Sequence, residues 1–129
     1  RGKDFSENLE NAIPENTDLI VLAGFLSILK PEFCQKWEGK MINIHPALLP
    51  KFGGKGMWGH HVHNAVIEAG EKESGATVHF VTSGIDEGEI ILQGKFDVEE
   101  NDSAETLAQK VHQVEYDIFP KAIDLVLNK

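Results

Sequence analysis

Residues 41–50 of the chain read MINIHPALLP, and this stretch predicts a buried strand together with the point where it ends. Three of its first four residues are apolar, and Pro46 then interrupts the run because a proline cannot donate to a sheet ladder. Asn43 and His45 are two residues apart, so on a strand their side chains lie on the same face. The stretch therefore predicts an amide and an imidazole side by side at the carboxyl end of a strand.

This pair of polar side chains predicts a candidate site. Open α/β sheets form their binding crevices at the carboxyl ends of strands. Asn43 offers a hydrogen-bond donor for an oxyanion, and His45 offers a group that can move a proton. From this stretch alone, a capped strand with a loop histidine of no chemical role remains the alternative.

The segments before this stretch predict an α/β fold. Residues 5–13 have apolar side chains at helical spacing, and residues 18–25, DLIVLAGF, are an apolar run typical of a strand buried on both faces of a parallel sheet. Residues 31–37 begin with a proline and predict a short helix, which Gly39 ends. The alternation of helices and strands predicts βαβ units, and so a mostly parallel sheet with flanking helices.

The segments after it predict a helix and two more strands. Residues 61–69 predict the helix, and its apolar face consists of Val62, Ala65, Val66 and Ala69. Residues 76–81 alternate like a strand, and residues 89–98 predict an antiparallel or edge strand because a glycine and charged residues interrupt it. His79 is more typical of a satisfied strand histidine than of a catalytic one. Asp86, in a loop between two glycines, is by itself typical of a turn.

The last segment, residues 102–127, predicts a long helix. Asp102 and Glu105 form an Asp-x-x-Glu capping box at its start. The apolar stripe follows steps of four, three and four, and consists of Leu107, Val111, Val114 and Ile118. Pro120 should kink or break the helix. Glu115 flanks the stripe and faces either the solvent or the edge of the sheet.

Composition and charge limit the classes of function. A net charge of −9 argues against nucleic acid as the main partner, since phosphate backbones require a basic face. No apolar run approaches the roughly 20 residues of a membrane span. The single cysteine, Cys34, excludes an internal disulfide and a cysteine-based metal site, which suits a reducing cytoplasm. We therefore expect a cytoplasmic protein with one domain, residues 1–129, and no nucleic-acid or membrane partner.

A glycine-rich loop and three histidines follow the central stretch. Residues 51–59, KFGGKGMWG, lack the spacing of a phosphate-binding loop, so we expect their glycines to serve turn geometry. His60, His61 and His63 resemble a metal-binding tract. Because no acidic or cysteine ligand lies at a recognised spacing, we expect no metal there.

Three stretches taken together carry a family resemblance. They are NIHPALLPKF from residue 43, GATVHFVTSGIDEGEIILQ from residue 75 and VEYDIFPKAI from residue 114. In order and spacing the chain resembles the phosphoribosylglycinamide formyltransferases, folate-dependent enzymes of purine biosynthesis with a Rossmann-type fold. Methionyl-tRNA formyltransferase and formyltetrahydrofolate hydrolase share parts of the pattern, but the hydrolase usually has a second histidine where Pro46 stands here. The resemblance implies transfer of a formyl group from 10-formyltetrahydrofolate to the amine of glycinamide ribonucleotide, without a metal.

The resemblance also implies the site residues. The catalytic asparagine, histidine and aspartate of the family match Asn43, His45 and Asp86. Asp86 would favour the charged imidazolium of His45, since an opposite charge raises the pKa of a histidine. The glutamate that meets the ribose of the nucleotide matches Glu115. The positions that match folate-binding residues are Arg1, Leu26, Ser27, Ile28, Leu29, Asn43, Thr82, Ser83, Gly84 and Ile85.

The first strand of the family and its phosphate-binding turn lie upstream of anything that this chain matches. The resemblance therefore implies an N-terminal portion that is missing here, and an exposed apolar edge where the sheet should continue. We expect an upstream fragment or a second chain to complete the sheet. A formyltetrahydrofolate hydrolase or another folate-dependent formyltransferase is the first alternative, and an inactive folate-binding fragment is the second.

Overall fold

The computed structural model describes residues 12–14, 16–23, 29–54, 56–57, 59–83 and 87–128. The elements in chain order are β1 (Ile20–Leu22), α2 (Pro31–Lys36), β2 (Met41–His45), α3 (His60–Glu68), β3 (Glu73–Phe80), β4 (Ile90–Asp97) and α4 (Ala104–Leu127). The four strands form one sheet in the order β1-β2-β3-β4. β1 is parallel to β2, whereas β3 is antiparallel to both β2 and β4.

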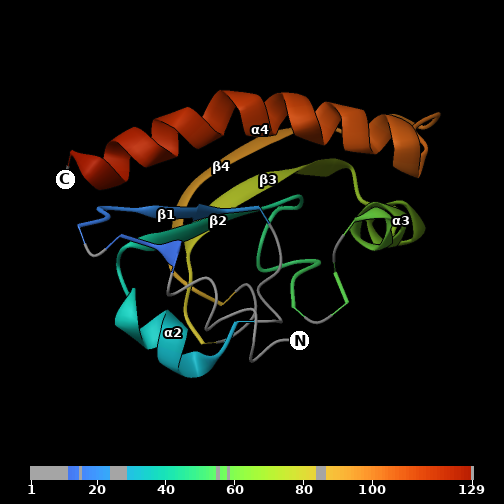
Figure 1. Cartoon of the computed structure of the whole chain (residues 1–129). Coiled ribbons are helices and arrows are strands. Elements are labelled where there is room, and N and C mark those ends of the chain that lie inside the picture. The colour runs from blue at the N-terminus through green and yellow to red at the C-terminus, as the bar shows by residue number, and fades with distance from the viewer. Residues whose placement is uncertain are drawn as a thin grey trace.

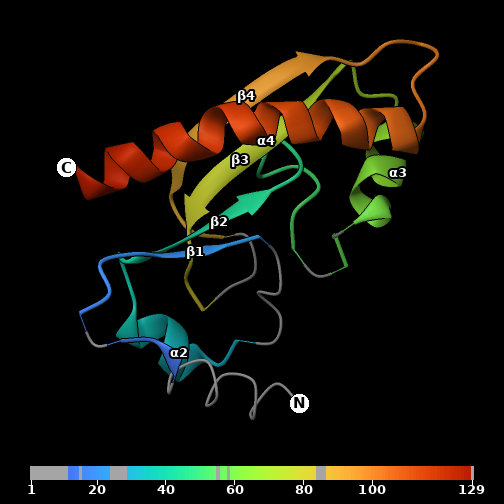
Figure 2. The same cartoon turned by 45° about the horizontal axis from the view of Figure 1, so that its top comes forward.

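Helices cover both faces of this open sheet. Figure 1 shows α4 along one face and α2 on the opposite side, and α3 lies beyond the end of the sheet close to the start of α4. The turned view in Figure 2 keeps α4 and α2 on opposite sides. The predicted α/β class with an open sheet and flanking helices is confirmed. The sheet is mixed, and it is parallel only at its start.

Alternation along β2 divides the apolar core between the two faces. Ile42 and Ile44 pack in the cluster that includes Val111 and Ile118 of α4. Met41 packs in the other cluster, which includes Phe33, Cys34 and Trp37 of the α2 region. Because side chains two residues apart share a face, Asn43 and His45 lie on the same face as Met41. All five residues of β2 are buried, as its sequence predicts.

β1 is shorter and more exposed than its sequence predicts. The predicted strand covered residues 18–25, but β1 contains only Ile20–Leu22, and residues 24–25 lie outside the described part of the chain. Val21 is 41% exposed, so the prediction of burial on both faces is wrong at this residue. The physical reason is position: β1 comes first in the sheet order, so among the described strands only β2 lies beside it. The predicted helix over residues 5–13 also lies almost wholly outside the described residues.

The two short helices form close to their predicted places. α2 ends at Lys36, and Gly39 follows in the left-handed region at φ +79°. α3 was predicted over residues 61–69, and it begins and ends one residue earlier, at His60 and Glu68. Ala69 is therefore the C-cap and is exposed, so its predicted place on the apolar face is wrong. His63, which the sequence did not single out as a core residue, is buried with Val62 and Val66 instead.

β3 and β4 form the predicted antiparallel pair. β3 starts at Glu73, earlier than predicted, because Gly75 has no side chain where the backbone of β4 approaches it. Among the described strands β4 lies at an edge of the sheet, as predicted, and it packs against α4. Gly94 permits this close packing, since a methyl group there would lie 2.6 Å from Cγ1 of Val114 and 2.9 Å from Cγ2 of Ile118.

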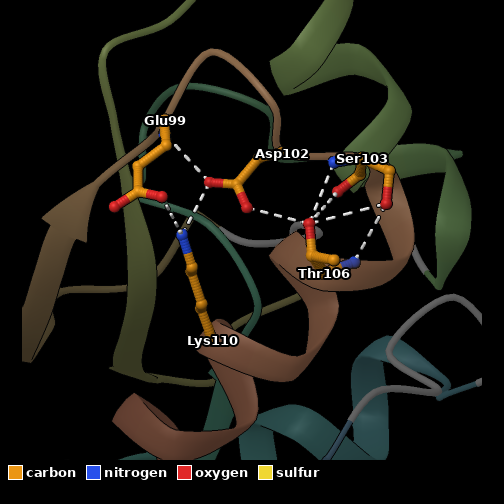
Figure 3. Close-up of polar contacts among 5 residues, drawn as sticks. All are labelled: Glu99, Asp102, Ser103, Thr106 and Lys110. Carbon is orange, nitrogen blue, oxygen red and sulfur yellow. Dashed lines mark hydrogen bonds and ion pairs between the residues drawn. The ribbon is translucent and has the colours of Figure 1, made fainter.

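The capping box of α4 forms one residue later than predicted. The N-cap is Ser103, whose Oγ accepts from the backbone N–H of Thr106 at 3.2 Å (Figure 3). The Ser103 N–H in turn donates to Oγ1 of Thr106 at 2.9 Å. The prediction of a box between Asp102 and Glu105 is therefore wrong. Asp102 and Ser103 are both favourable N-cap residues, and the register that forms leaves the Asp102 carboxylate to bind elsewhere.

The Asp102 carboxylate ties the turn before α4 to the helix itself. It accepts from Nζ of Lys110 at 2.8 Å, from the backbone N–H of Glu99 at 2.9 Å and from Oγ1 of Thr106 at 2.8 Å (Figure 3). These contacts, led by the hydrogen bond from Lys110, lower the pKa of Asp102 to about 2. The side chain of Asp102 is 5% exposed, so the carboxylate is an integral part of this turn.

α4 continues through Pro120 to Leu127, so of the predicted kink or break, the break does not occur. The buried stripe extends beyond the prediction, with Ile118 before the proline and Ala122 after it, and both hold the helix on the sheet. Pro120 itself is exposed, so the carbonyl that lacks its usual partner lies on the solvent side, where water can bind it. No helix in the described part of the chain is long and apolar enough to cross a membrane.

Candidate active site

Polar side chains cross one face of the sheet at the end of β2. Strand register places Asn43 opposite His79, and His45 opposite Thr77. These four side chains are 3% exposed or less. Because paired residues on neighbouring strands point to the same face, the amide and imidazole predicted from the sequence lie beside a second imidazole and a hydroxyl from β3.

The Asn43 amide is oriented by His79. Nδ2 of Asn43 lies 3.2 Å from Nε2 of His79, and Nδ1 of His79 lies 2.9 Å from the carbonyl oxygen of Phe80. A carbonyl only accepts hydrogen bonds, so Nδ1 of His79 carries the proton and Nε2 of the neutral ring accepts from Asn43. His79 thus fixes the plane of the amide. This contact could not be predicted from the sequence, because His79 is 36 residues away from Asn43.

His45 is held by the loop that follows its own strand. Its Nε2 donates to the backbone carbonyl of Phe52 at 2.7 Å, which requires a proton on that nitrogen. Phe52 adopts φ 57°, a left-handed conformation that is uncommon for a residue other than glycine. The residues between Pro46 and Phe52 therefore turn back on themselves and place a carbonyl oxygen against the imidazole.

His63 on α3 adds a third imidazole, within electrostatic range of His45. Burial, and then the charges of His112, His60 and His45 in that order, together lower the pKa of His63 to about 4. Its Nδ1 has no hydrogen-bond partner among the described residues. His63 is therefore neutral at pH 7. Helical periodicity could have predicted that His63, next to Val62 in the chain, lies at the edge of the buried face of α3.

Glu115 lies on α4 beside His112. Nδ1 of His112 donates to Oε1 of Glu115 at 2.9 Å, and the carboxylate side chain is 20% exposed. His112 and His45 both act electrostatically on His63, which places the Glu115 region of α4 within range of the β2 end. Of the two orientations that the sequence left open for Glu115, the structure shows a mostly buried side chain held by an exposed histidine.

The structure describes only part of the predicted site. Leu29 packs beside the α2 cluster, and Thr82 and Ser83 follow β3. The other predicted positions, Arg1, Leu26, Ser27, Ile28, Gly84, Ile85 and Asp86, lie outside the described residues. The predicted contact between Asp86 and His45 therefore stays a prediction. Within the described ranges, no group of three or more histidine, cysteine, aspartate or glutamate residues is arranged to hold a metal ion.

Comparison with known proteins gives a consistent result. Residues 1–123 match the formyl transferase family. Phosphoribosylglycinamide formyltransferase of Haemophilus influenzae is 44% identical over 128 residues, which cover 94% of this chain and 58% of that protein. The trifunctional purine biosynthetic protein adenosine-3 of Drosophila melanogaster is 42% identical, over 97% of this chain and 9% of its own length.

Solved structures agree with the sequence relatives. The crystal structure of phosphoribosylglycinamide formyltransferase from Anaplasma phagocytophilum has a TM-score of 0.81 at 36% identity, and covers 98% of this chain and 59% of that one. The Coxiella burnetii enzyme, solved in complex with CHES, has a TM-score of 0.80 at 39% identity, with 94% and 55% coverage. This chain thus spans little more than half of these proteins. Because the family match covers nearly all of the chain and the fold agrees, the chain belongs to the formyl transferase family.

Proposed function

We propose that this chain takes part in the transfer of the formyl group of 10-formyltetrahydrofolate to the amine of glycinamide ribonucleotide, a step of purine biosynthesis. One observation carries the proposal: a chain 44% identical to the Haemophilus formyltransferase holds a buried amide and imidazole side by side at the end of β2. Those two groups suit a reaction in which negative charge develops on a carbonyl oxygen.

In the proposed reaction, the amine of the nucleotide attacks the formyl carbon. A new carbon–nitrogen bond forms while the bond from that carbon to the folate nitrogen breaks, and the proton lost by the amine ends on the folate nitrogen. Asn43 donates a hydrogen bond to the formyl oxygen of the tetrahedral intermediate. His45, in its protonated form, stabilises the same oxygen, and Asp86 favours that charge state and orders a water that relays the proton.

The orientation of the two donors supports this assignment. His79 fixes the plane of the Asn43 amide, whose nitrogen carries two N–H donors. Phe52 fixes the ring of His45 through Nε2. Side chains held before the substrate arrives need no reorganisation during the reaction. The activated amide of the donor requires no metal in this scheme.

The same proposal assigns the binding contacts. The folate would lie against Arg1, residues 26–29, Asn43 and residues 82–85, and Glu115 would meet the ribose of the nucleotide. Glu115 supports this because its carboxylate is held by His112 within electrostatic range of the β2 end. We expect the whole chain to be one formyltransferase domain in the cytoplasm, in which the open side of β1 takes a further strand. The 41% exposure of Val21 on that first strand supports the last point.

Product analysis tests the function. The purified 129-residue chain, and the same chain extended by its upstream residues, are incubated with 10-formyltetrahydrofolate with and without glycinamide ribonucleotide. We expect formylated nucleotide from the extended protein only when the nucleotide is present, and no turnover by the shorter chain. Formate release without the nucleotide would instead favour a hydrolase. If the extended protein bound folate but formylated no amine, the second alternative, an inactive folate-binding protein, would be favoured.

A further inference from the structure

The loop after β2 is clamped to the sheet by two polar side chains, Thr77 on β3 and Gln93 on β4. Oγ1 of Thr77 donates to the carbonyl oxygen of Ala47 at 2.8 Å and accepts from the N–H of Leu49 at 3.1 Å. Nε2 of Gln93 donates to the carbonyl oxygen of Leu49 at 2.9 Å and to Oγ1 of Thr77 at 2.9 Å. Three hydrogen bonds therefore hold this short loop from one side, and a fourth joins the two clamping side chains to each other.

The Thr77 hydroxyl and the amide nitrogen of Gln93 use every hydrogen bond that they can make in this clamp. A threonine hydroxyl has one donor and two acceptor lone pairs, and Thr77 uses all three. A glutamine amide nitrogen has two N–H donors, and Gln93 uses both. Because the Thr77 hydroxyl is fully buried, a shift of the loop would leave this hydroxyl without its partners, which favours a single arrangement of the loop.

Strand register explains why the clamp lies beside the candidate site. His45 on β2 pairs with Thr77, and Thr77 pairs with Gln93, so the three side chains form one row across the sheet. The loop passes over this row directly after His45, and it reaches Phe52 three residues after Leu49. The clamped residues Ala47 and Leu49 thus lie, along the chain, between His45 and the Phe52 carbonyl that holds its imidazole.

We propose that Gln93 and Thr77 are positioning residues for His45. They act through the backbone of Ala47 and Leu49, and they hold the Phe52 carbonyl opposite Nε2 of the imidazole. The inference rests on the function proposed above for His45. Among the described residues, the side chain of the exposed Gln93 donates its hydrogen bonds to Leu49 and Thr77, so it acts on His45 through the loop.

Three substitutions separate this role from general support of the fold. Thr77→Ser keeps the hydroxyl, Thr77→Val removes it at nearly the same volume, and Gln93→Met removes the amide at nearly the same length. Lys95→Met is the matched control, because Lys95 is exposed two residues further along β4 on the same face as Gln93. All are made in the enzyme extended by its upstream residues.

Two measurements are made on each variant: steady-state kinetics, and ¹⁵N NMR of the His45 imidazole. We expect Thr77→Val and Gln93→Met to lower kcat about 10–100-fold with little change in KM, because a small misplacement of a catalytic group costs this much. The hydrogen-bonded Nε2–H resonance of His45 should shift or broaden in both. Thr77→Ser and Lys95→Met should keep the parent kcat within about threefold and the parent resonance.

The outcomes distinguish the inference from the function on which it rests. If Gln93→Met keeps both the parent kcat and the parent His45 resonance, the inference is wrong. If the parent protein formylates no amine, the proposed function fails, and the resonance alone then decides whether the clamp positions His45. Should Thr77→Val fail to fold, Gln93→Met still decides the question, since its side chain lies at the surface.

Discussion

The amide nitrogen of Asn43 lies 3.2 Å from Nε2 of His79, across the pair of strands β2 and β3. Both side chains are almost fully buried, and the His79 ring is fixed by its second hydrogen bond, to the carbonyl of Phe80. A buried amide with a fixed acceptor cannot turn without losing that partner, which costs about 1–3 kcal/mol. Asn43 is therefore a preorganised donor, and His79 sets its direction.

The first prediction concerns turnover at this pair. In the extended enzyme, Asn43→Ala and His45→Ala should each lower kcat by about 10²–10³, because each removes one group that stabilises the developing oxyanion. Folate affinity, measured by fluorescence titration, should change much less than kcat. Asn64→Ala on the exposed side of α3 is the control and should leave kcat unaltered. Near-normal turnover by His45→Ala would show that the proposed mechanism is wrong.

The central pair could be predicted from the sequence because its cause is local. An apolar run ended by Pro46 gives the strand, and alternation places Asn43 and His45 on one face. Their partners could not be predicted in the same way. Strand register brings His79 and Thr77 to the pair, and a left-handed turn brings Phe52. Neither the register nor the turn can be predicted from the residues near β2.

The second prediction concerns the close packing of α4 on β4. Gly94→Ala should lower the free energy of unfolding by about 1–3 kcal/mol, since the added methyl group would overlap Val114 and Ile118 in a packed core. Urea unfolding followed by circular dichroism measures the change. Adding Val114→Ala to Gly94→Ala should recover part of the loss, because it removes the nearest methyl group. An unchanged urea midpoint for Gly94→Ala alone would contradict the observed packing.

Errors in predicting the fold arose where two local signals compete or where packing decides. Asp102 and Ser103 are both good N-caps, and only the turn that binds the Asp102 carboxylate to Glu99 selects the serine. Pro120 disfavours a helix, yet burial of Ile118 and Ala122 on either side of it keeps α4 intact. The exposure of Val21 depends on the position of β1 in the sheet, and the apolar sequence of β1 does not determine that position.

The third prediction concerns the start of α4. Ser103→Ala should lower the free energy of unfolding by about 1 kcal/mol through loss of the N-cap. Asp102 should act through its charge. Its pKa is lowered in the folded state, so its contribution to stability is complete above pH 3.8 and is lost as the pH falls toward about 2. Asp102→Asn should remove this acid-dependent loss.

Thermal unfolding between pH 2 and pH 5 measures the effect of Asp102. Asp117→Asn is the matched control, because Asp117 pairs with Lys121 on the same helix but its side chain is 67% exposed. We expect the control to keep the pH dependence of the parent protein between pH 3.8 and pH 2. If Asp102→Asn and Asp117→Asn gave the same pH dependence, the contacts in Figure 3 would contribute nothing specific to the stability of the turn.

The fourth prediction concerns the buried imidazole of His63. Because its pKa is about 4 in the folded state and near 6.5 in the unfolded chain, the unfolded state binds a proton first as the pH falls. The folded protein should therefore lose stability between pH 6.5 and pH 4, by about 1–2 kcal/mol at pH 5 from this residue.

Denaturant unfolding at pH 7.5 and pH 5 measures the loss. His63→Phe should reduce the difference between the two pH values, whereas His61→Gln, at an exposed position on the same helix, should preserve it. Equal pH dependence in His63→Phe and the parent protein would mean that His63 takes up a proton without unfolding, contrary to its burial on α3 and to the effect of the charges of His112 and His45.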